Sequence, residues 1–133
     1  MKILFVCKYN RFRSKVAESI FNKLNKNKNI ICESAGVLAD TCHLHIEQNV
    51  INIMNEKGYN IPALPRQATK KLTEKFDALI IVADDVNPEY FFDFSGKILC
   101  WPFKDCDGND IKKIKEIINS IEDKIKDFIK NLD

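Results

Sequence analysis

The chain has 133 residues, about the size of one ordinary domain, and it is 45% hydrophobic and 30% charged. The formal net charge of +2 is close to balance, which argues against nucleic acid or an acidic membrane surface as a partner. No apolar run is long enough to span a bilayer or to form a signal-peptide core, and the five cysteines include no CxxC pair. We therefore expect one cytoplasmic domain over residues 1–133 with free thiols.

Hydrophobic periodicity predicts alternating strands and helices in the first half of the chain. Residues 2–6 form an apolar run typical of a buried strand, and apolar positions between 16 and 24 recur at helical spacing. A second strand is expected at 30–33, with a turn at 34–36. Apolar residues from 46 to 54 then predict a second helix.

The same alternation continues through the second half. Thr69 is placed to cap a short helix that runs to residue 75, and residues 78–82 form an apolar segment typical of a buried strand. Pro88 suits the first position of another short helix. A fourth strand is expected at 97–101, and an isoleucine stripe over 111–132 predicts a long amphipathic helix whose apolar face belongs to the core.

This order of elements indicates an α/β fold. Four strand-helix repeats predict a single three-layer domain, in which a four-stranded parallel sheet carries helices on both faces. Ligands of such sheets bind beyond the carboxyl ends of the strands, near the point where the strand order reverses. The loop after the first strand is a common place for that site, and here it begins with Cys7.

The chemistry of this loop suits a phosphate group. Five residues separate Cys7 from Arg13, and Ser14 follows at the start of the predicted helix. Amides of a tight loop and of a helix N-terminus bind an anion, and Arg13 can add a bidentate fork. The same positive field favours the thiolate of Cys7, to which Ser14 can donate a hydrogen bond. A cysteine at a strand end is more often a small buried hydrophobe, but its place between strand and helix favours a nucleophile.

At these residues the chain resembles the low-molecular-weight protein tyrosine phosphatases and the related thioredoxin-coupled arsenate reductases. The resemblance covers nearly the whole chain and implies the same fold, with no metal and no organic cofactor. The motifs that carry it are Val6-Cys7 with Arg13-Ser14 and Ala17-Glu18, Ser34-Ala35-Gly36, Arg66-Gln67 with Thr69, Asp84 with Asn87, and Trp101-Pro102-Phe103-Lys104-Asp105.

The resemblance also implies a two-step hydrolysis of a phosphorylated protein or a small phosphomonoester. Cys7 would attack phosphorus and form a phosphocysteine, while Arg13 stabilises the transition state. Asp105 would protonate the leaving oxygen and then activate water. Asn10 and Ser34 would hold the loop in shape.

The acid itself stays open between two aspartates. Asp107 rivals Asp105 by position, and either residue could instead serve a turn or a helix cap. The match of Asp105 to the Trp-containing segment of the family favours Asp105.

The other loop residues complete the expected substrate-binding set, which consists of Lys8, Tyr9, Asn10, Arg11, Phe12 and Ser14. Lys8 and Arg11 make the loop basic and would favour anionic substrates, although solvated surface charge explains them equally well. Tyr9 and Phe12 could form walls of a cleft or could pack in the core. Phe12 stands where many members of the family have a second cysteine.

Two departures from the family pattern keep other functions open. Cys106 replaces the usual proline after the acid, and Asp107-Gly108 replaces the aromatic residues of tyrosine-specific members. An arsenate reductase would need a thiol relay, for which Cys106 is the loop thiol that could resolve an intermediate on Cys7 and thioredoxin the partner. A non-catalytic phosphate-binding module is the third possibility.

The remaining cysteines and histidines carry less information. Cys42, His43 and His45 raise the question of zinc, but neither a CxxC nor an HxxxH pair completes a ligand set, so no metal site is expected. Cys32 and Cys100 fall in predicted strands and are expected to be buried.

Overall fold

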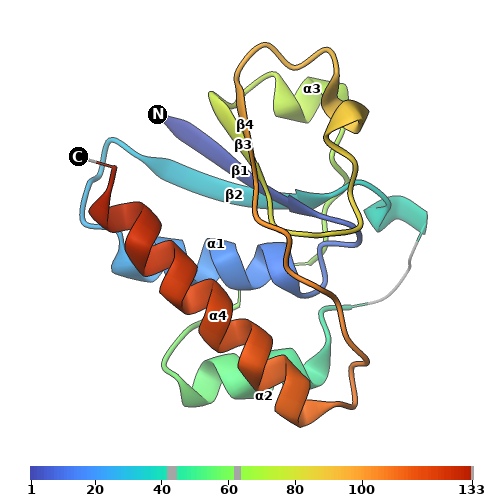
Figure 1. Cartoon of the computed structure of the whole chain (residues 1–133), viewed down its shortest axis with the longest axis vertical. Coiled ribbons are helices and arrows are strands. Elements are labelled where there is room, and N and C mark those ends of the chain that lie inside the picture. Colours follow the sequence, from blue (N-terminus) through green and yellow to red (C-terminus); the bar gives the residue numbers. More distant parts are fainter. Residues whose placement is uncertain (42–44, 62–63, 133) are drawn as a thin grey trace.

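A four-stranded parallel sheet forms the centre of the molecule (Figure 1). The computed structural model describes residues 1–41, 45–61 and 64–132. Its strands are β1 (Lys2–Cys7), β2 (Ile31–Gly36), β3 (Ala78–Ile81) and β4 (Lys97–Cys100), in the spatial order β2-β1-β3-β4. The chain crosses β1 on its way from β2 to β3, so the strand order reverses at the carboxyl ends of β1 and β3.

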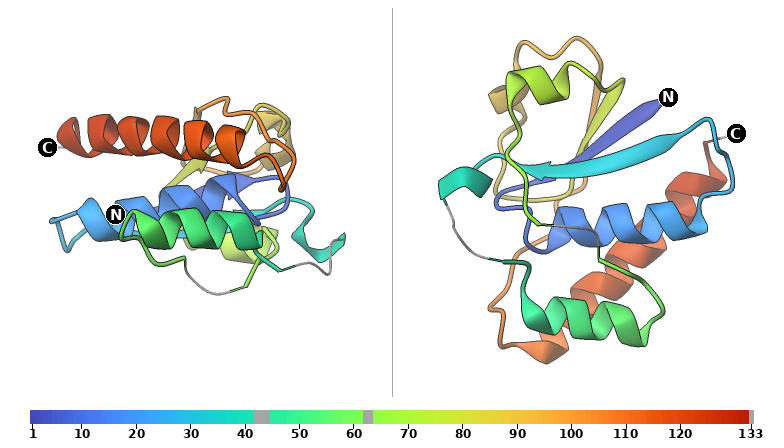
Figure 2. Two further views of the ribbon diagram at one scale, coloured as in Figure 1. Left: turned by 90° about the horizontal axis from the view of Figure 1, so that it is seen from below. Right: turned by 180° about the vertical axis from the view of Figure 1, so that it is seen from behind.

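Helices cover both faces of the sheet, which confirms the predicted three-layer α/β fold (Figures 1 and 2). One face carries three helices, namely α1 (Arg13–Leu24), α2 (Gln48–Glu56) and α4 (Ile111–Lys130). The other face carries the short α3 (Lys70–Thr73) and the 3-10 helix η2 (Pro88–Phe91). A further 3-10 turn, η1 (Ala39–Thr41), follows β2.

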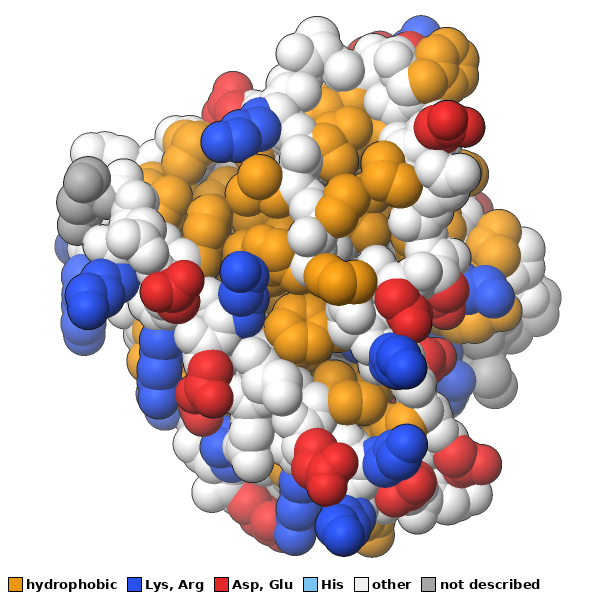
Figure 3. All heavy atoms as spheres, in the orientation of Figure 1, with side chains coloured by type: hydrophobic (Ala, Val, Ile, Leu, Met, Phe, Trp, Pro, Cys, Tyr) orange, Lys and Arg blue, Asp and Glu red, His pale blue; other side chains and the backbone are white. Residues whose placement is uncertain are grey.

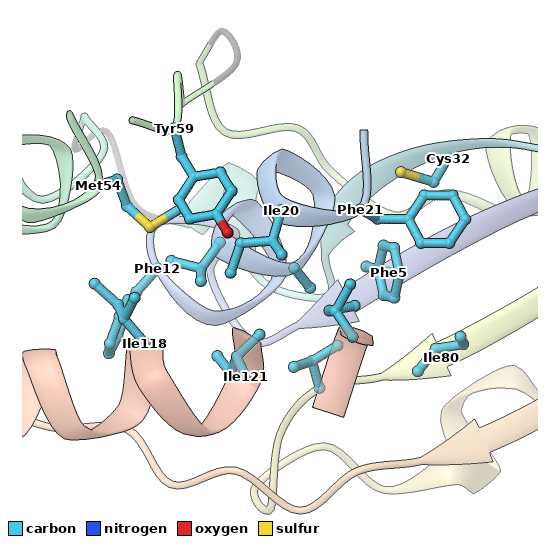
Figure 4. Packing of buried hydrophobic residues seen from close by; sticks show 14 of the residues in the cluster. Phe5, Phe12, Ile20, Phe21, Cys32, Met54, Tyr59, Ile80, Ile118 and Ile121 are labelled. Carbon is cyan, nitrogen blue, oxygen red and sulfur yellow. The ribbon is translucent and has the colours of Figure 1, made fainter. Parts of the chain in front are cut away.

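The alternation of side chains along β1 divides the core between the two faces. Ile3 and Phe5 point to the side of α1 and α4, whereas Leu4 and Val6 point to the side of α3. Figure 4 shows Phe5 against Phe21 of α1, with aromatic ring centroids 6.0 Å apart. The predicted stripe of α4 is buried through Ile114, Ile118, Ile121 and Ile125. This packing fixes the strand ends that position the site.

The turn predicted at 34–36 is wrong, because Ser34, Ala35 and Gly36 continue β2. They lie opposite Phe5, Val6 and Cys7 of β1, and on the other side Gly36 donates to the carbonyl of Arg66 at 2.8 Å and accepts from the nitrogen of Ala68 at 2.9 Å. A Cβ atom on Gly36 would lie 2.6 Å from the backbone nitrogen of Asn10. The glycine therefore provides close contact between the strand and the loop rather than a turn.

The expectation that Cys100 is buried is also wrong. Cys100 ends the edge strand β4 and is exposed, whereas Cys32 is buried in β2 as expected. Hydrophobic side chains gather over the β4 region of the face in Figure 3, while charged side chains cover the outer side of α4. In the described part of the chain, none of the helices has the length and apolar character needed to cross a membrane.

Candidate active site

The loop between β1 and α1 brings Cys7 to the point where the strand order reverses. Cys7 ends β1 with 2% of its surface exposed, and α1 begins at Arg13. Asn10 adopts a left-handed backbone with φ of 56°, a conformation that asparagine tolerates better than most residues. This turn aims the Asn10 amide at the Cys7 sulfur, at an N–Sγ distance of 3.3 Å.

The side chain of Asn10 ties the loop to the sheet. Its Nδ2 donates to Ser14 Oγ at 2.7 Å and to Ser34 Oγ at 3.0 Å, and its Oδ1 accepts from the backbone nitrogen of Arg66 at 2.9 Å. Ser14 Oγ lies 2.9 Å from Cys7 Sγ. The residues expected to shape the loop thus form one hydrogen-bonded cluster around the thiol.

Arg13 is buried behind the loop and is held by carboxylates. Only 2% of its surface is exposed, and its Nη1 donates to the carbonyl of Phe103 at 2.9 Å. Asp85 contacts both terminal nitrogens, at 3.0 and 3.3 Å. Asp84 lies at 3.6 Å and Asp105 at 3.9 Å from the guanidinium. These contacts fix the plane of the Arg13 fork before any anion binds.

A pocket of about 80 Å³ opens beside the loop. It is lined by Cys7, Tyr9, Arg11, Phe12, Arg13, Glu47, Val50, Asp105, Cys106, Gly108 and Ile114. Asp105 therefore shares the pocket with the thiol and the guanidinium. Asp107 is not among the lining residues; its carboxylate accepts a hydrogen bond from the backbone nitrogen of Asn109 at 2.8 Å, which is turn chemistry.

Some of the other predicted loop residues line the pocket, and others lie at the protein surface. Tyr9 and Phe12 both line the pocket, and Phe12 is also part of the core around α1 and α4. Lys8 lies outside the pocket, with its ammonium 5.3 Å from the centre of the Tyr9 ring. Arg11 turns toward α2, where it donates to the carbonyl of His45 at 2.7 Å and pairs with Glu47 at 3.3 Å.

Cys106 is the second thiol of the pocket. Burial raises the pKa of Cys106, and the negative charges of Asp105 and Asp110 raise it further. Its thiol form is therefore favoured at neutral pH.

The structure shows no zinc site among the residues that it describes. Cys42 and His43 lie outside the described residues, and no group of three potential ligands occurs within them.

Sequence reasoning missed three residues that shape this site. Asp85 could have been found, because it follows Asp84 at the carboxyl end of β3, beside the strand that carries Cys7. No sequence pattern pointed to Glu47, because this residue lines the pocket only where the tertiary structure places the start of α2 beside the loop. Lys15 is buried in the first turn of α1, although an isolated lysine in a sequence suggests solvent.

A comparison with protein families shows which family the chain belongs to. The family model for "Low molecular weight phosphotyrosine protein phosphatase" matches residues 2–133. The chain belongs to this family. A member of the low-molecular-weight phosphatase family is thus expected to use the loop between β1 and α1 for cysteine chemistry on an oxyanion.

Individual relatives of this family member carry different activities in their names. A putative arsenate reductase of Halobacterium salinarum is 25% identical over 131 residues, covering 96% of this chain and 89% of that protein. The low-molecular-weight tyrosine phosphatase of T. tengcongensis has a TM-score of 0.86 at 22% identity and covers 99% of both chains. The arginine phosphatase YwlE of Geobacillus stearothermophilus has a TM-score of 0.85 at 20% identity, covering 98% of this chain and 92% of its own.

These relatives support a cysteine-based phosphatase or arsenate reductase and leave the choice to the residues of this chain. The two structural likenesses fall below 25% identity and bear on the fold alone. The substrate therefore has to be argued from the pocket itself.

Proposed function

We propose that this low-molecular-weight phosphatase hydrolyses phosphate monoesters, with phosphotyrosine of proteins as its substrate class. The observation that carries the proposal is the convergence of Cys7, Arg13 and Asp105 on one small pocket. A thiol, a preorganised cation and a carboxyl group are the three functions that phosphoryl transfer through a cysteine requires. The aromatic walls Tyr9 and Phe12 suit a flat aromatic leaving group.

The first step is attack of Cys7 on the bound phosphoryl group. The loop amides and the Arg13 fork bind the three non-bridging oxygens and stabilise the charge that they carry in the transition state. Ser14 and the amide of Asn10, at 2.9 and 3.3 Å from Cys7 Sγ, stabilise the thiolate before attack. The P–O bond to the leaving group breaks as the S–P bond forms, which gives a phosphocysteine.

Asp105 serves both halves of the reaction. In its protonated form it donates a proton to the leaving phenolate oxygen, and as a carboxylate it then accepts a proton from the water that attacks phosphorus. Hydrolysis of the S–P bond releases inorganic phosphate and restores Cys7. Asp105 has 46% of its side chain exposed, so water has access to the acid.

Replacement of the nucleophile tests this proposal. Wild-type protein is expected to hydrolyse p-nitrophenyl phosphate, and Cys7→Ser should lower kcat by about a thousandfold or more because serine is not ionised at neutral pH. Cys100→Ser, at an exposed thiol of the sheet edge, is the matched control and should leave kcat unchanged. Full turnover in the Cys7→Ser protein would exclude the mechanism.

The substrate class needs its own experiment. Peptides of one sequence that carry phosphotyrosine, phosphoserine or phosphoarginine can be compared by kcat/KM. We expect the phosphotyrosine peptide to be preferred, since Tyr9 and Phe12 line the same pocket as the thiol. Preference for the phosphoarginine or phosphoserine peptide would retain the cysteine mechanism and reject the assigned substrate.

Arsenate reduction is a second candidate because Cys106 lines the same pocket as Cys7. Cys7 would displace hydroxide from arsenate, and the Cys106 sulfur would then attack Cys7, releasing arsenite and leaving a disulfide. The two thiols supply the two electrons, and thioredoxin would restore them. Asp84 and Asp85 pair with Arg13 at the segment where related reductases carry relay cysteines, which disfavours this function. Thioredoxin-dependent arsenate reduction that disappears in Cys106→Ser would support it over hydrolysis.

A further inference from the structure

The first two turns of α1 bury a lysine and a glutamate that the reaction does not use. Lys15 has 4% of its surface exposed and Glu18 has 8%. The Lys15 Nζ lies 3.8 Å from Glu18 Oε1. Burying two charges is unfavourable even when they pair, and such pairs add little to stability compared with well-packed apolar residues. Their position directly behind the loop suggests a role beyond stability.

A continuous hydrogen-bond chain leads from Glu18 to the nucleophile. Ser34 donates its hydroxyl proton to Glu18 Oε1, which leaves Ser34 Oγ as the acceptor for Asn10 Nδ2 at 3.0 Å. The second proton of that amide goes to Ser14 Oγ at 2.7 Å. The Ser14 proton can then point to Cys7 Sγ, 2.9 Å away, or to the carbonyl of Ala35 at 3.5 Å. A carboxylate at the Glu18 end thus turns the Ser34 proton away from Asn10, so that the Asn10 amide can donate to both serines.

We propose that Lys15 is a positioning residue that keeps Glu18 a carboxylate and thereby holds Ser34 as the acceptor that places Asn10 beside Ser14 and Cys7. The proposal rests on the proposed function in that it assigns Lys15 to the phosphate-binding loop. Lys15 acts through Glu18, Ser34 and Asn10 and does not itself line the pocket.

The charges around Glu18 show why a cation is needed there. Burial raises the pKa of Glu18 above its ordinary value of 4.5, and Glu33 adds to the rise. The hydrogen bond from Ser34 and the positive charges of Lys15 and Arg66 limit the rise without cancelling it. Arg66 is bound to Glu33 at 2.8 Å and is more exposed than Lys15, so it compensates Glu18 less well. Protonated Glu18 would become a donor toward Ser34 and would disrupt the chain.

The charge on Lys15 is set by the same surroundings. Burial lowers the pKa of Lys15, and the charges of Glu18 and Cys7 raise it, whereas Arg66 lowers it. Removing Lys15 leaves Glu18 without its nearest cation. Removing both charges with an isosteric amide at position 18 keeps an acceptor oxygen for Ser34. The pair of variants therefore separates loss of charge balance from loss of the hydrogen-bond chain.

The experiment compares Lys15→Met, the double variant Lys15→Met with Glu18→Gln, and Lys26→Met at an exposed lysine as control. For each folded protein, kcat/KM for p-nitrophenyl phosphate is measured, along with protection of Cys7 from iodoacetamide by inorganic phosphate. We expect Lys15→Met to lower kcat/KM and phosphate affinity about tenfold, a loss typical of a displaced site. In the double variant, kcat/KM and phosphate affinity should return to within about threefold of the wild-type values. Lys26→Met should show the wild-type values.

Two outcomes would overturn the proposal. Wild-type kcat/KM and phosphate protection in folded Lys15→Met would show that the ion pair only stabilises the helix. A double variant no better than Lys15→Met would show that the effect does not pass through Glu18. Phosphate protection is read without turnover, so a protein that fails to hydrolyse p-nitrophenyl phosphate still tests Lys15 while rejecting the proposed function.

A measurement on the wild-type protein covers the case in which Lys15→Met does not fold. The side-chain amide resonances of Asn10 and the carboxyl carbon of Glu18 can be followed by NMR as the pH is lowered. We expect one shared midpoint, because protonation of Glu18 removes the acceptor that orders Ser34 and Asn10. Asn10 resonances that do not change while Glu18 titrates would contradict the proposal.

Discussion

Arg13 illustrates how the residues of this site are ordered before a ligand arrives. Its guanidinium is buried, and its two terminal nitrogens contact the carbonyl of Phe103 at 2.9 Å and carboxylates at 3.0 to 3.9 Å. Asp85 makes the two-point contact, whereas Asp84 touches one nitrogen at 3.6 Å. Two-point contacts fix orientation, which a bidentate grip on phosphate requires.

The two adjacent aspartates provide a matched test of this orientation. Asp85→Asn should lower kcat/KM for p-nitrophenyl phosphate about tenfold, because a misdirected guanidinium loses transition-state contacts. Asp84→Asn changes the same group one residue away and should cost less than about threefold, since its contact is longer and single. Steady-state kinetics of both purified variants check the prediction. Equal losses in the two variants would mean that total negative charge matters rather than geometry.

Asp105 and Asp107 offer a second comparison at the scale of single residues. Asp105→Asn should lower kcat about a hundredfold for phenyl phosphate and much less for p-nitrophenyl phosphate, whose leaving group needs little protonation. Asp107→Asn should change kcat less than about twofold, because its carboxylate serves the turn at Asn109. The dependence of kcat on leaving-group pKa measures the difference. The opposite ranking would make Asp107 the acid.

The predictability of the site follows from how its residues are distributed along the chain. Cys7, Arg13 and Ser14 belong to one continuous segment. Their spacing and their chemistry could therefore both be read from a few neighbouring residues. Lys15 belongs to the same segment, yet its burial depends on packing that no local pattern encodes. Glu47 reaches the pocket from α2 by a long-range contact. Local chemistry was therefore predictable, whereas partners supplied by tertiary structure were not.

At the scale of elements, α4 shows how one helix closes the face of the sheet that bears α1. Its isoleucine stripe was recognisable because isoleucines recur at helical spacing along the whole helix. Ile118 is fully buried in this stripe near Phe12 and Met54 (Figure 4), whereas Ile111, at the start of the helix, is 48% exposed. The helix thus joins the core directly to a wall of the pocket.

Removing one methylene group from each of these isoleucines tests this closure. Ile118→Val should lower the free energy of unfolding by about 1 kcal/mol through lost contacts and a small cavity. Ile111→Val should change it by less than about 0.5 kcal/mol. Urea titrations followed by circular dichroism measure both values. If the two variants lost a similar free energy of unfolding, the loss would reflect the lower helix propensity of valine and not packing against the core.

The contact between α2 and α4 predicts a dependence of stability on pH. Burial alone would raise the pKa of Glu122, but hydrogen bonds from Tyr59 and Lys57 outweigh it, so the pKa lies below its ordinary value of 4.5. A carboxyl with a lowered folded-state pKa stabilises the protein above its unfolded value, and that contribution is lost as the pH falls through the folded value. Acidification below about pH 4.5 should therefore weaken this link.

Glu122→Gln tests this contribution. At pH 7 the variant should be less stable than wild type by about 1 kcal/mol, through loss of a charged hydrogen-bond acceptor for Tyr59. The difference should shrink as the pH falls below 4.5 and through the lowered folded-state pKa of Glu122, because the wild-type carboxyl group then becomes protonated. Glu116→Gln, at an exposed glutamate of the same helix, is the control and should show little difference at either pH. Urea unfolding at several pH values provides the comparison, and a gap that widens in acid would contradict the assigned direction.

At the scale of the whole molecule, the fold was more predictable than its details. Alternation of strands and helices sufficed for a parallel sheet, because parallel strands require crossovers. The same reasoning failed at Ser34-Ala35-Gly36, since small residues that suggest a turn also suit a strand pressed against a loop. It failed at Cys100 because burial of a residue in an edge strand depends on what packs over it. Cys32 lies in the other edge strand, β2, and is covered by α1, whereas Cys100 at the end of β4 is exposed.

The hydrogen bonds around Cys7 have a consequence for synthesis of the protein. The nucleophile leaves the ribosome before its partners, because Ser34, the backbone of Arg66, Asp85 and the carbonyl of Phe103 follow it in the chain. A nascent chain therefore displays the thiol long before the groups that hold its loop and its arginine have been made. The reactive centre is completed only after Phe103 has been made, when most of the sheet is available to fold as a unit.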